Sequence, residues 1–335
     1  MRRLLVPLLF FGLLTVPAQR AEAWNELGHM AIAKVAYDQA DDGLKLRVFN
    51  LLKAHPHFDE YLAKSCPEGI GVQEWAWLRA SIWPDWIRHR REKETRGERV
   101  YKFSRPDDHY INVPFIDPAR LDLFKDLKSE PDKHDILAAF RQRVGEINLR
   151  EASAEDKAIA LCWLFHLVGD VHQPLHCCTF YSAQFPEGDR GGTRFAFASG
   201  GKRHQLHRFW DEALGDVPGS DDDPAPRQGK LYKRIAEVAE SLRQPDYGRE
   251  QLRELRDNPT FPAWVRESHG WAVKTAYRNG TLQGVPTKPD GSLPANAPAA
   301  ANDYETAARA LARQRAALAG HRLADKLKEL KLAKD

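Results

Sequence analysis

The stretch HLVGDVHQPLH, residues 166–176, does most to decide the fold and the chemistry of this chain. It ends an apolar segment that runs from residue 155 with the spacing of an α-helix, and Pro174 should terminate that helix. On such a helix His166 and Asp170 share one face, so an imidazole and a carboxylate can bind one divalent metal ion. His176 follows the helix-breaking proline and can fold back toward the same place. The stretch therefore predicts a helix that ends in a metal site.

A second pair of the same kind lies farther along the chain. In HRFWD, residues 207–211, His207 and Asp211 are again four residues apart. A lone pair with this spacing is commonly a contact on a helix surface, but two pairs together with His176 favour a site for more than one metal ion. Imidazole and carboxylate ligands without thiolates suit zinc.

The rest of the chain indicates a mainly helical protein. Residues 183–201 are rich in glycine and aromatic residues and predict a small β-hairpin or a long loop. The compositions of residues 216–228 and 283–302, rich in Pro, Gly, Asp and Ala, are typical of surface linkers. Since neither a break in composition nor a repeat divides the chain, we expect an all-α fold in one domain, residues 24–335. Apolar residues recur with helical spacing in residues 26–53, 70–90, 135–148, 155–173, 229–243, 261–279 and 303–332.

Residues 1–23 have the pattern of a secretory signal peptide. Arg2 and Arg3 precede an apolar run that ends at Val16, and Ala21 and Ala23 are the small residues of a cleavage site. The apolar run is shorter than the about 20 residues that span a bilayer. We therefore expect cleavage after Ala23 and a soluble, secreted or periplasmic protein that begins at Trp24.

Net charge limits how this protein can hold an anionic ligand. The formal net charge is +3, and removal of residues 1–23 takes away three Arg and one Glu, which lowers it to +1. Proteins that bind nucleic-acid phosphates usually carry a strong basic excess. A phosphate substrate would therefore need another source of positive charge.

The four cysteines predict a disulfide. Secretion would place Cys66, Cys162, Cys177 and Cys178 in an oxidising compartment, where three pairings are possible. Adjacent Cys177 and Cys178 rarely bond to each other, so we expect a bridge from one of them to Cys162 or Cys66. The sequence contains no C-x-x-C pair, which argues against a cysteine zinc site.

Taken together, these residues resemble the S-one/P-one nuclease family, the zinc nucleases that cut single-stranded nucleic acid. The resemblance extends from Trp24 to the final helix, and it rests on WNELGH at residues 24–29, WPDWIR at 83–88 and HYINVP at 109–114 as well as on residues 166–176 and 207–211. It implies a phospholipase C/nuclease-like fold and a secreted, monomeric endonuclease of single-stranded DNA and RNA. Activity on 3′-mononucleotides is implied by the resemblance alone.

The same resemblance implies three zinc ions at nine ligand positions. Three zinc ions would outweigh three carboxylates, which would give the near-neutral chain a positive pocket for phosphate. The first ion would be held by Asp85, His109, His166 and Asp170, the second by His176, His207 and Asp211, and the third by His29, Asp170 and the amino nitrogen and carbonyl oxygen of Trp24.

The implied mechanism is hydrolysis by a hydroxide that bridges the first and third zinc ions. Asp85 would orient this hydroxide, and Arg88 would stabilise the charge of the transition state. Tyr110 would stack on an unpaired base, and Asn112, where many relatives carry aspartate, would contact that base. From the residues alone, the spacing of Asp85 and Arg88 favours a surface ion pair, and Tyr110 can equally pack in the core.

Two other functions fit parts of the pattern. A zinc-dependent phospholipase C shares the fold and the N-terminal tryptophan, but it is expected to have glutamate in place of Asp211 and a wider spacing than that from Trp24 to His29. A secreted zinc-binding protein without turnover is expected to close each zinc with four protein ligands. The second ion here would have three, so the nuclease is the better interpretation.

Overall fold

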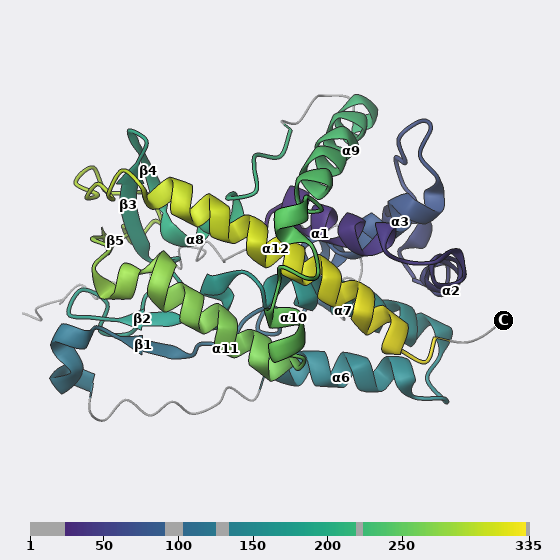
Figure 1. Cartoon of the computed structure of the whole chain (residues 1–335), viewed down its shortest axis with the longest axis horizontal. Coiled ribbons are helices and arrows are strands. Elements are labelled where there is room, and N and C mark those ends of the chain that lie inside the picture. Colours follow the sequence, from purple (N-terminus) through teal and green to yellow (C-terminus); the bar gives the residue numbers. More distant parts are fainter. Residues whose placement is uncertain (1–23, 91–102, 125–133, 219–223, 333–335) are drawn as a thin grey trace, which may run out of the picture.

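The computed structural model describes residues 24–90, 103–124, 134–218 and 224–332. The predicted signal peptide, residues 1–23, lies outside these ranges. Helices predominate, as the sequence predicts, and short strands gather at one end of the molecule (Figure 1). The α-helices are α1 (Glu26–Asp38), α2 (Asp42–Leu52), α3 (Val72–Ala80), α4 (Trp83–Arg90), α6 (Ile136–Asn148), α7 (Ala154–Asp170), α8 (Leu206–Asp211), α9 (Pro224–Ser241), α10 (Glu254–Asp257), α11 (Phe261–Trp271) and α12 (Tyr304–Glu329).

Short segments of other types connect these helices. The strands are β1 (Pro114–Ile116), β2 (Thr179–Tyr181), β3 (Phe195–Ser199), β4 (Lys202–Gln205) and β5 (Val285–Pro286). The short 3₁₀ and π segments are η1 (Phe58–Leu62), η2 (Pro118–Phe124), η3 (Pro174–Cys177), η4 (Pro245–Tyr247), η5 (Ala272–Ala276) and η6 (Arg278–Gly280).

Helix α7 forms the centre of the molecule. Every residue from Ala158 to Asp170 is buried, as expected for a helix that other helices surround. Ser153 caps its first turn by accepting a hydrogen bond from the backbone N–H of Asp156. Helices α1, α2, α3, α4, α6 and α12 all pack against α7, so side chains from several segments can meet His166 and Asp170.

The C-terminal part of the chain packs over this centre. Helix α12, drawn in yellow across the middle of Figure 1, lies along α1 and also contacts α7. Helix α11 packs against η3, the short segment that carries His176. Residues far apart in the sequence therefore support the segment that carries residues 166–176.

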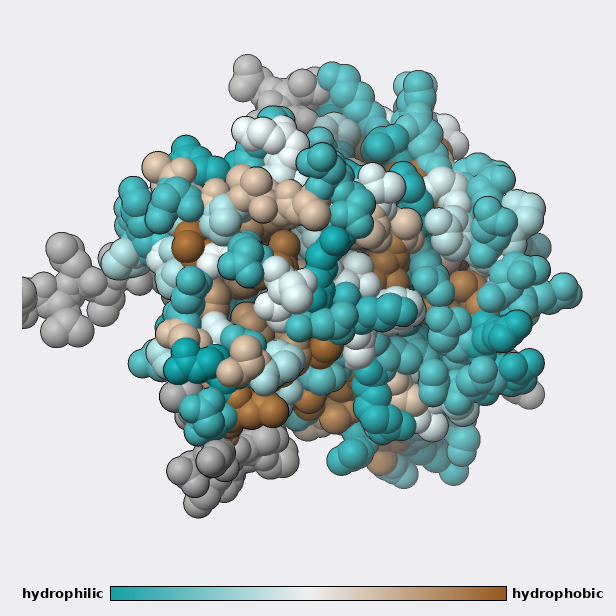
Figure 2. All heavy atoms as spheres, turned by 60° about the vertical axis from the view of Figure 1, so that its left-hand side comes forward, coloured by the Kyte–Doolittle hydropathy of each residue, from teal (hydrophilic) through white to brown (hydrophobic). Residues whose placement is uncertain are grey.

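The strands form two small sheets. Strand β1 pairs in parallel with β2, with Phe115 opposite Phe180, and β3 pairs antiparallel with both β4 and β5. Phe115, Phe180, Phe195 and Tyr277 belong to a second apolar cluster beside the main core. Figure 2 brings this end of the molecule forward and shows a mostly hydrophilic surface with small, separate hydrophobic patches.

Some element bounds differ from those that the sequence predicts. Residues 26–53 form two helices, because Asp41 caps α2 by accepting a hydrogen bond from the N–H of Leu44. The linker predicted at 216–228 is too long, because α9 begins at Pro224, and proline is favoured in the first turn of a helix. The hairpin predicted within 183–201 is formed by β3 and β4 and continues to Gln205.

The disulfide predicted from the sequence is not formed. All four cysteines are free thiols. The Sγ of Cys177 lies 3.7 Å from the carbonyl oxygen of Val171, and the Sγ of Cys66 lies 3.3 Å from that of Ile70. These two thiols therefore contact nearby backbone rather than another cysteine.

Candidate metal centre

Side chains from four segments converge at the C-terminal end of α7. His166 and Asp170 belong to α7, His29 to α1, Asp85 to α4, and His109 to the loop before β1. The ligand atoms of His29, His166 and Asp170 lie within 4.8 Å of one another, and so do those of Asp85, His109 and His166. The structure thus brings together five of the residues that the sequence predicts as metal ligands.

Asp170 lies at the centre of this group and is fully buried. Its Oδ1 is 3.2 Å from Nε2 of His29. Its Oδ2 is 3.1 Å from Nδ1 of His109 and 3.2 Å from Nε2 of His166. The two oxygens of one carboxylate therefore face different imidazoles, which is the arrangement that a bridge between two metal ions requires.

A backbone carbonyl group orients His166. The carbonyl oxygen of Ser81 lies 2.7 Å from Nδ1 of His166, so Nδ1–H can donate to it while Nε2 faces Asp170 and Asp85. The ring of His166 also stacks on that of His29, with centroids 4.2 Å apart and 15° between the planes. An imidazole that binds a metal commonly donates its other N–H in this way.

Several buried polar atoms of this group have no hydrogen-bond partner among the described residues. A buried polar atom without a partner costs about 1–3 kcal/mol, so such a set is expected where another group binds. Imidazole nitrogen and carboxylate oxygen are ligands that zinc prefers, and the residues therefore fit a metal ion. Nε2 of His109 and Oδ1 of Asp85 are two such atoms. Nε2 of His29 and Oδ1 of Asp170 are two more, because they lie 3.2 Å apart without the geometry of a hydrogen bond.

Burial and neighbouring charges set the protonation of this group. Burial lowers the pKa of His29 and lowers the pKa of His109 to about 4. Burial would also lower the pKa of His166, but the carboxylates of Asp170 and Asp85 outweigh it and raise this pKa to about 9. Two of the three imidazoles are therefore neutral near pH 7 and have a free lone pair, and a dication can replace the proton on the third.

His176, His207 and Asp211 form a further group, again with ligand atoms within 4.8 Å of one another. Nε2 of His207 is 3.2 Å from Nε2 of His176 and 3.7 Å from Oδ2 of Asp211. Nδ1 of His176 lies 2.7 Å from the backbone oxygen of His109. This contact ties the group around α8 to the loop that supplies His109.

Two buried residues that the sequence did not identify hold this second group in place. Asp189 accepts hydrogen bonds from the Tyr277 hydroxyl at 2.7 Å and from the backbone N–H of Phe180 at 2.9 Å. The N–H of Gly191 offsets part of the rise in the Asp189 pKa that burial causes. The carbonyl oxygen of Gly191 in turn lies 2.6 Å from Nδ1 of His207. Gln173 donates a hydrogen bond from Nε2 to Oδ1 of Asp211 at 2.7 Å. The only sequence signals for these roles were positions beside the Gly-Gly pair and beside Pro174.

Trp24 and His29 approach the end of α7 closely. Trp24 is fully buried, and its indole Nε1 donates to the carbonyl oxygen of Gly169 at 3.1 Å. A Cβ atom at Gly169 would lie 2.6 Å from Nδ1 of His29, so this position requires glycine. These contacts place the Trp24 ring beside the residue that precedes Asp170.

Arg88 faces the group from α4. It is 8% exposed, and its Nη1 lies 4.0 Å from Oδ1 of Asp85. Burial is the largest cause of the low pKa of His109, and the positive charge of Arg88 lowers this pKa further. The pair of Arg88 and Asp85 is therefore not the surface ion pair that the spacing alone would favour.

Tyr110 and Asn112 lie on the chain just after His109. Tyr110 is half-buried, and its hydroxyl donates to Asp107 at 3.1 Å. Asn112 is exposed, and its amide oxygen accepts a hydrogen bond from the Thr179 hydroxyl at 2.7 Å. Tyr110 is therefore not a fully buried core residue.

The chain is similar to known nucleases. The sequence profile of the S1/P1 nuclease family matches residues 24–331. Endonuclease 3 of Arabidopsis thaliana is 25% identical over 278 residues, which cover 80% of this chain and 80% of that protein. Endonuclease 2 of the same plant is 24% identical over 211 residues, or 61% of this chain and 60% of that protein. All nine predicted ligand positions lie within the range that matches the family.

Proposed function

The chain belongs to the S1/P1 nuclease family and hydrolyses phosphodiester bonds, and from this premise we propose that it is a zinc-dependent endonuclease of single-stranded DNA and RNA. The observation that carries the proposal is the position of Asp170. One of its carboxylate oxygens faces His29, and the other faces His109 and His166. A carboxylate between imidazoles in this way suits a cluster of zinc ions at a phosphodiesterase site.

Three zinc ions would be held by the nine predicted ligands. The close grouping of their side-chain ligand atoms supports this assignment, as do the buried atoms without hydrogen-bond partners. One ion would bind Asp85, His109, His166 and Asp170, another His176, His207 and Asp211, and the third His29, Asp170 and the α-amino nitrogen and carbonyl oxygen of Trp24.

Asp85 and Arg88 would act on the reacting groups. Bound zinc would supply positive charge opposite the phosphate and would lower the pKa of water from about 16 toward 7. Oδ1 of Asp85 lies 3.7 Å from Nδ1 of His109 and 3.6 Å from Nε2 of His166, so this carboxylate lies among the predicted ligands, where it would orient the attacking hydroxide by accepting a hydrogen bond from it. Arg88 carries a permanent charge beside Asp85 and can donate to a phosphate oxygen as negative charge develops.

A preference for single strands would come from Tyr110 and Asn112. The half-buried Tyr110 ring can stack on an unpaired base, which a duplex offers only after unstacking. The amide oxygen of Asn112 already accepts from Thr179, so its amide nitrogen would donate to the base.

The mature protein would be a secreted or periplasmic monomer that begins at Trp24. The family match also begins at residue 24, directly after the predicted cleavage site. Every helix in the described ranges is too short or too polar to cross a lipid bilayer. Cleavage after Ala23 would free the α-amino group that the third zinc ion needs.

The test compares five substrates before and after removal of zinc by a chelator: single-stranded DNA, RNA, duplex DNA, a 3′-mononucleotide and phosphatidylcholine. We expect cleavage of both single strands, loss of that cleavage on chelation, and recovery on addition of zinc. Preferential hydrolysis of phosphatidylcholine would instead identify a phospholipase C. Cleavage that survives chelation would exclude a zinc-dependent reaction.

A further inference from the structure

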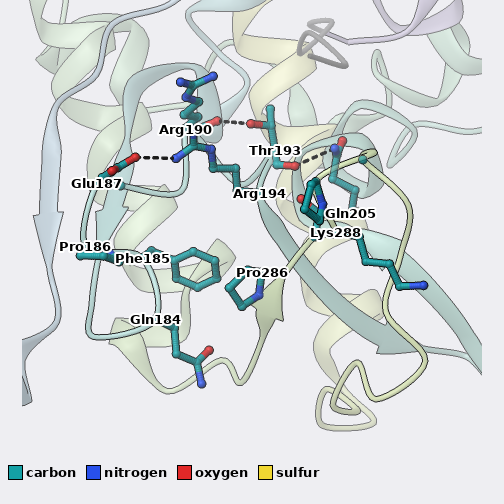
Figure 3. A pocket seen from close by; sticks show the side chains of 14 residues that line it. Gln184, Phe185, Pro186, Glu187, Arg190, Thr193, Arg194, Gln205, Pro286 and Lys288 are labelled. Carbon is teal, nitrogen blue, oxygen red and sulfur yellow. Dashed lines mark hydrogen bonds and ion pairs between the residues drawn. The ribbon is translucent and has the colours of Figure 1, made fainter. Parts of the chain in front are cut away.

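A pocket of about 440 Å³ lies at the end of the molecule that carries β3, β4 and β5 (Figure 3). The loop between β2 and β3 forms one wall, and the segment from Pro286 to Gly291 forms another. Phe185 closes the pocket on an apolar side, where it stacks on Phe195 with ring centroids 5.3 Å apart. The predicted metal ligands do not line this pocket, so it is a separate feature.

Positive charge dominates the lining of the pocket. The lining contains three cationic side chains, those of Arg190, Arg194 and Lys288, and one carboxylate, that of Glu187. Oε2 of Glu187 lies 3.5 Å from Nη1 of Arg194. In Figure 3 the two arginines lie on one side of the pocket and Lys288 on the other. Such an excess of positive charge favours an anion, and the planar guanidinium group matches the geometry of a phosphate.

The turn that supplies Arg190 also positions His207. The next residue, Gly191, has a φ of 61°, and a Cβ atom there would lie 2.5 Å from the carbonyl oxygen of Leu175, so only glycine fits. Its own carbonyl oxygen lies 2.6 Å from Nδ1 of His207. One face of this turn therefore contacts a predicted metal ligand, while Arg190 lines the pocket.

Gln205 provides a second link between the pocket and the predicted ligands. Its Nε2 donates to the carbonyl oxygen of Thr193 at 2.7 Å, and both residues line the pocket. Gln205 directly precedes α8, which carries His207 and Asp211. The segment around Gln205 therefore lines the pocket on one side and leads directly into the helix that carries His207 and Asp211.

Arg190 projects from a fixed turn. Its φ of 55° is a conformation that residues other than glycine rarely adopt. Its carbonyl oxygen accepts hydrogen bonds from the hydroxyl and the N–H of Thr193, at 3.0 and 3.3 Å. A charge held on a fixed turn loses little backbone freedom when it binds a ligand.

We propose that this pocket binds a backbone phosphate of the single-stranded substrate, at a nucleotide beyond those held at the candidate metal centre. The inference rests on the proposed function, because a single strand carries an anionic group at every nucleotide and not only at the one that is cleaved. Contacts to phosphate add affinity without reading the base. Arg190, Arg194 and Lys288 thus form a local basic site on a chain whose formal net charge is +3.

The test measures binding of a fluorescent, phosphorothioate-linked single strand to the zinc-loaded protein over a range of salt concentrations. The pocket variant combines Arg190→Ala, Arg194→Ala and Lys288→Ala. The control variant, Arg141→Ala, Arg150→Ala and Lys328→Ala, has the same net charge. Its three residues are exposed and lie on or next to α6 and near the end of α12, at the opposite end of the molecule (Figure 1).

We expect the pocket variant to bind the strand about tenfold more weakly than the control. The slope of log K against log salt should become less steep by about 0.7 for each phosphate contact that is lost. The KM for a long strand should rise in the pocket variant, whereas kinetics on a dinucleotide should not change in Lys288→Ala, which lies outside the turn that positions His207. Melting temperatures show whether the variants fold, and Lys288→Ala alone, outside the turn, should give a smaller change in the same direction.

Equal affinities and equal salt slopes for the pocket and control variants, in a protein that still cleaves single strands, would overturn the proposed subsite and leave the proposed function intact. A wild-type protein that neither binds nor cleaves single strands would overturn both.

Discussion

Gln173 donates a hydrogen bond of 2.7 Å from Nε2 to Oδ1 of Asp211, and its Oε1 accepts one of 2.6 Å from the N–H of Leu175. Both polar groups of this fully buried amide are therefore used. One holds the turn that carries His176, and the other holds the carboxylate at the end of α8. A single side chain thus joins two segments that supply the second group of predicted ligands.

Gln173→Leu should weaken zinc binding at the second group. The change keeps a side chain of similar size but releases Asp211 and the η3 turn. Loss of such an orienting contact lowers metal affinity by about 10- to 100-fold, and we expect a loss of this size. Elemental analysis after dialysis against a weak chelator should show about one zinc ion fewer per chain.

The matched control for this prediction is Gln142→Leu. Gln142 is exposed, and its Nε2 makes a comparable hydrogen bond of 2.8 Å to Glu146, far from the predicted ligands in the sequence. Wild-type zinc content in Gln173→Leu would show that the amide does not position Asp211 for metal.

Asp170→Asn should reduce activity and zinc content more than Asp211→Asn. Oδ1 of Asp170 faces His29, and its Oδ2 faces His109 and His166. The amide keeps the size of this side chain but loses the charge that would hold two dications close together. We expect close to three zinc ions in the wild type. Equal zinc content and equal activity in the two variants would rule out a bridging role.

One extra residue before Trp24 should abolish most of the nuclease activity without unfolding the protein. An amide nitrogen is a poor zinc ligand because its lone pair is delocalised, whereas a free α-amino group has a pKa of about 8 and can deprotonate to bind zinc. The extended protein should keep the other zinc ions. Full activity in a protein whose extension is verified by mass spectrometry would remove Trp24 from the site.

Glu267→Gln should strongly destabilise the fold. Glu267 on α11 binds two arginines of α12, at 2.8 Å to Arg315 and 2.7 Å to Arg322, and Arg315 is fully buried. Removal of the charge leaves buried arginines without compensation, which costs about 3–5 kcal/mol. Urea unfolding should show this loss, whereas Glu305→Gln, at a more exposed pair with Arg309, should cost less than about 1 kcal/mol.

The effect of Glu267 should depend on pH. Burial would raise its pKa, but Arg322 and Arg315 outweigh burial and lower it below the ordinary value of 4.5. The unfolded chain therefore binds this proton more readily, so the stabilisation is complete above about pH 4.5 and is lost as the pH falls through the folded-state pKa. The difference in unfolding free energy between wild type and Glu267→Gln should shrink in acid.

Local features of the fold and site could be predicted from the sequence. The helical spacing of residues 155–173, the break at Pro174 and the one-turn separation of His207 and Asp211 follow from 3.6 residues per turn, which any segment obeys by itself. The resemblance to known nucleases then indicated which distant residues belong with them. Bounds were less accurate where a cap such as Asp41 interrupts an apolar pattern.

The chemical character of the site was therefore decided by the sequence: imidazoles and carboxylates at spacings that suit zinc. Only the tertiary structure decided which atoms face one another. The two oxygens of Asp170 face different imidazoles because α1 brings His29 and the loop before β1 brings His109 to the end of α7. Gln173 reaches Asp211 only because the turn at η3 lies against α8. The prediction of a disulfide was wrong for the same reason. The distance between two cysteine side chains depends on how whole elements pack, and spacing along the chain does not specify that packing.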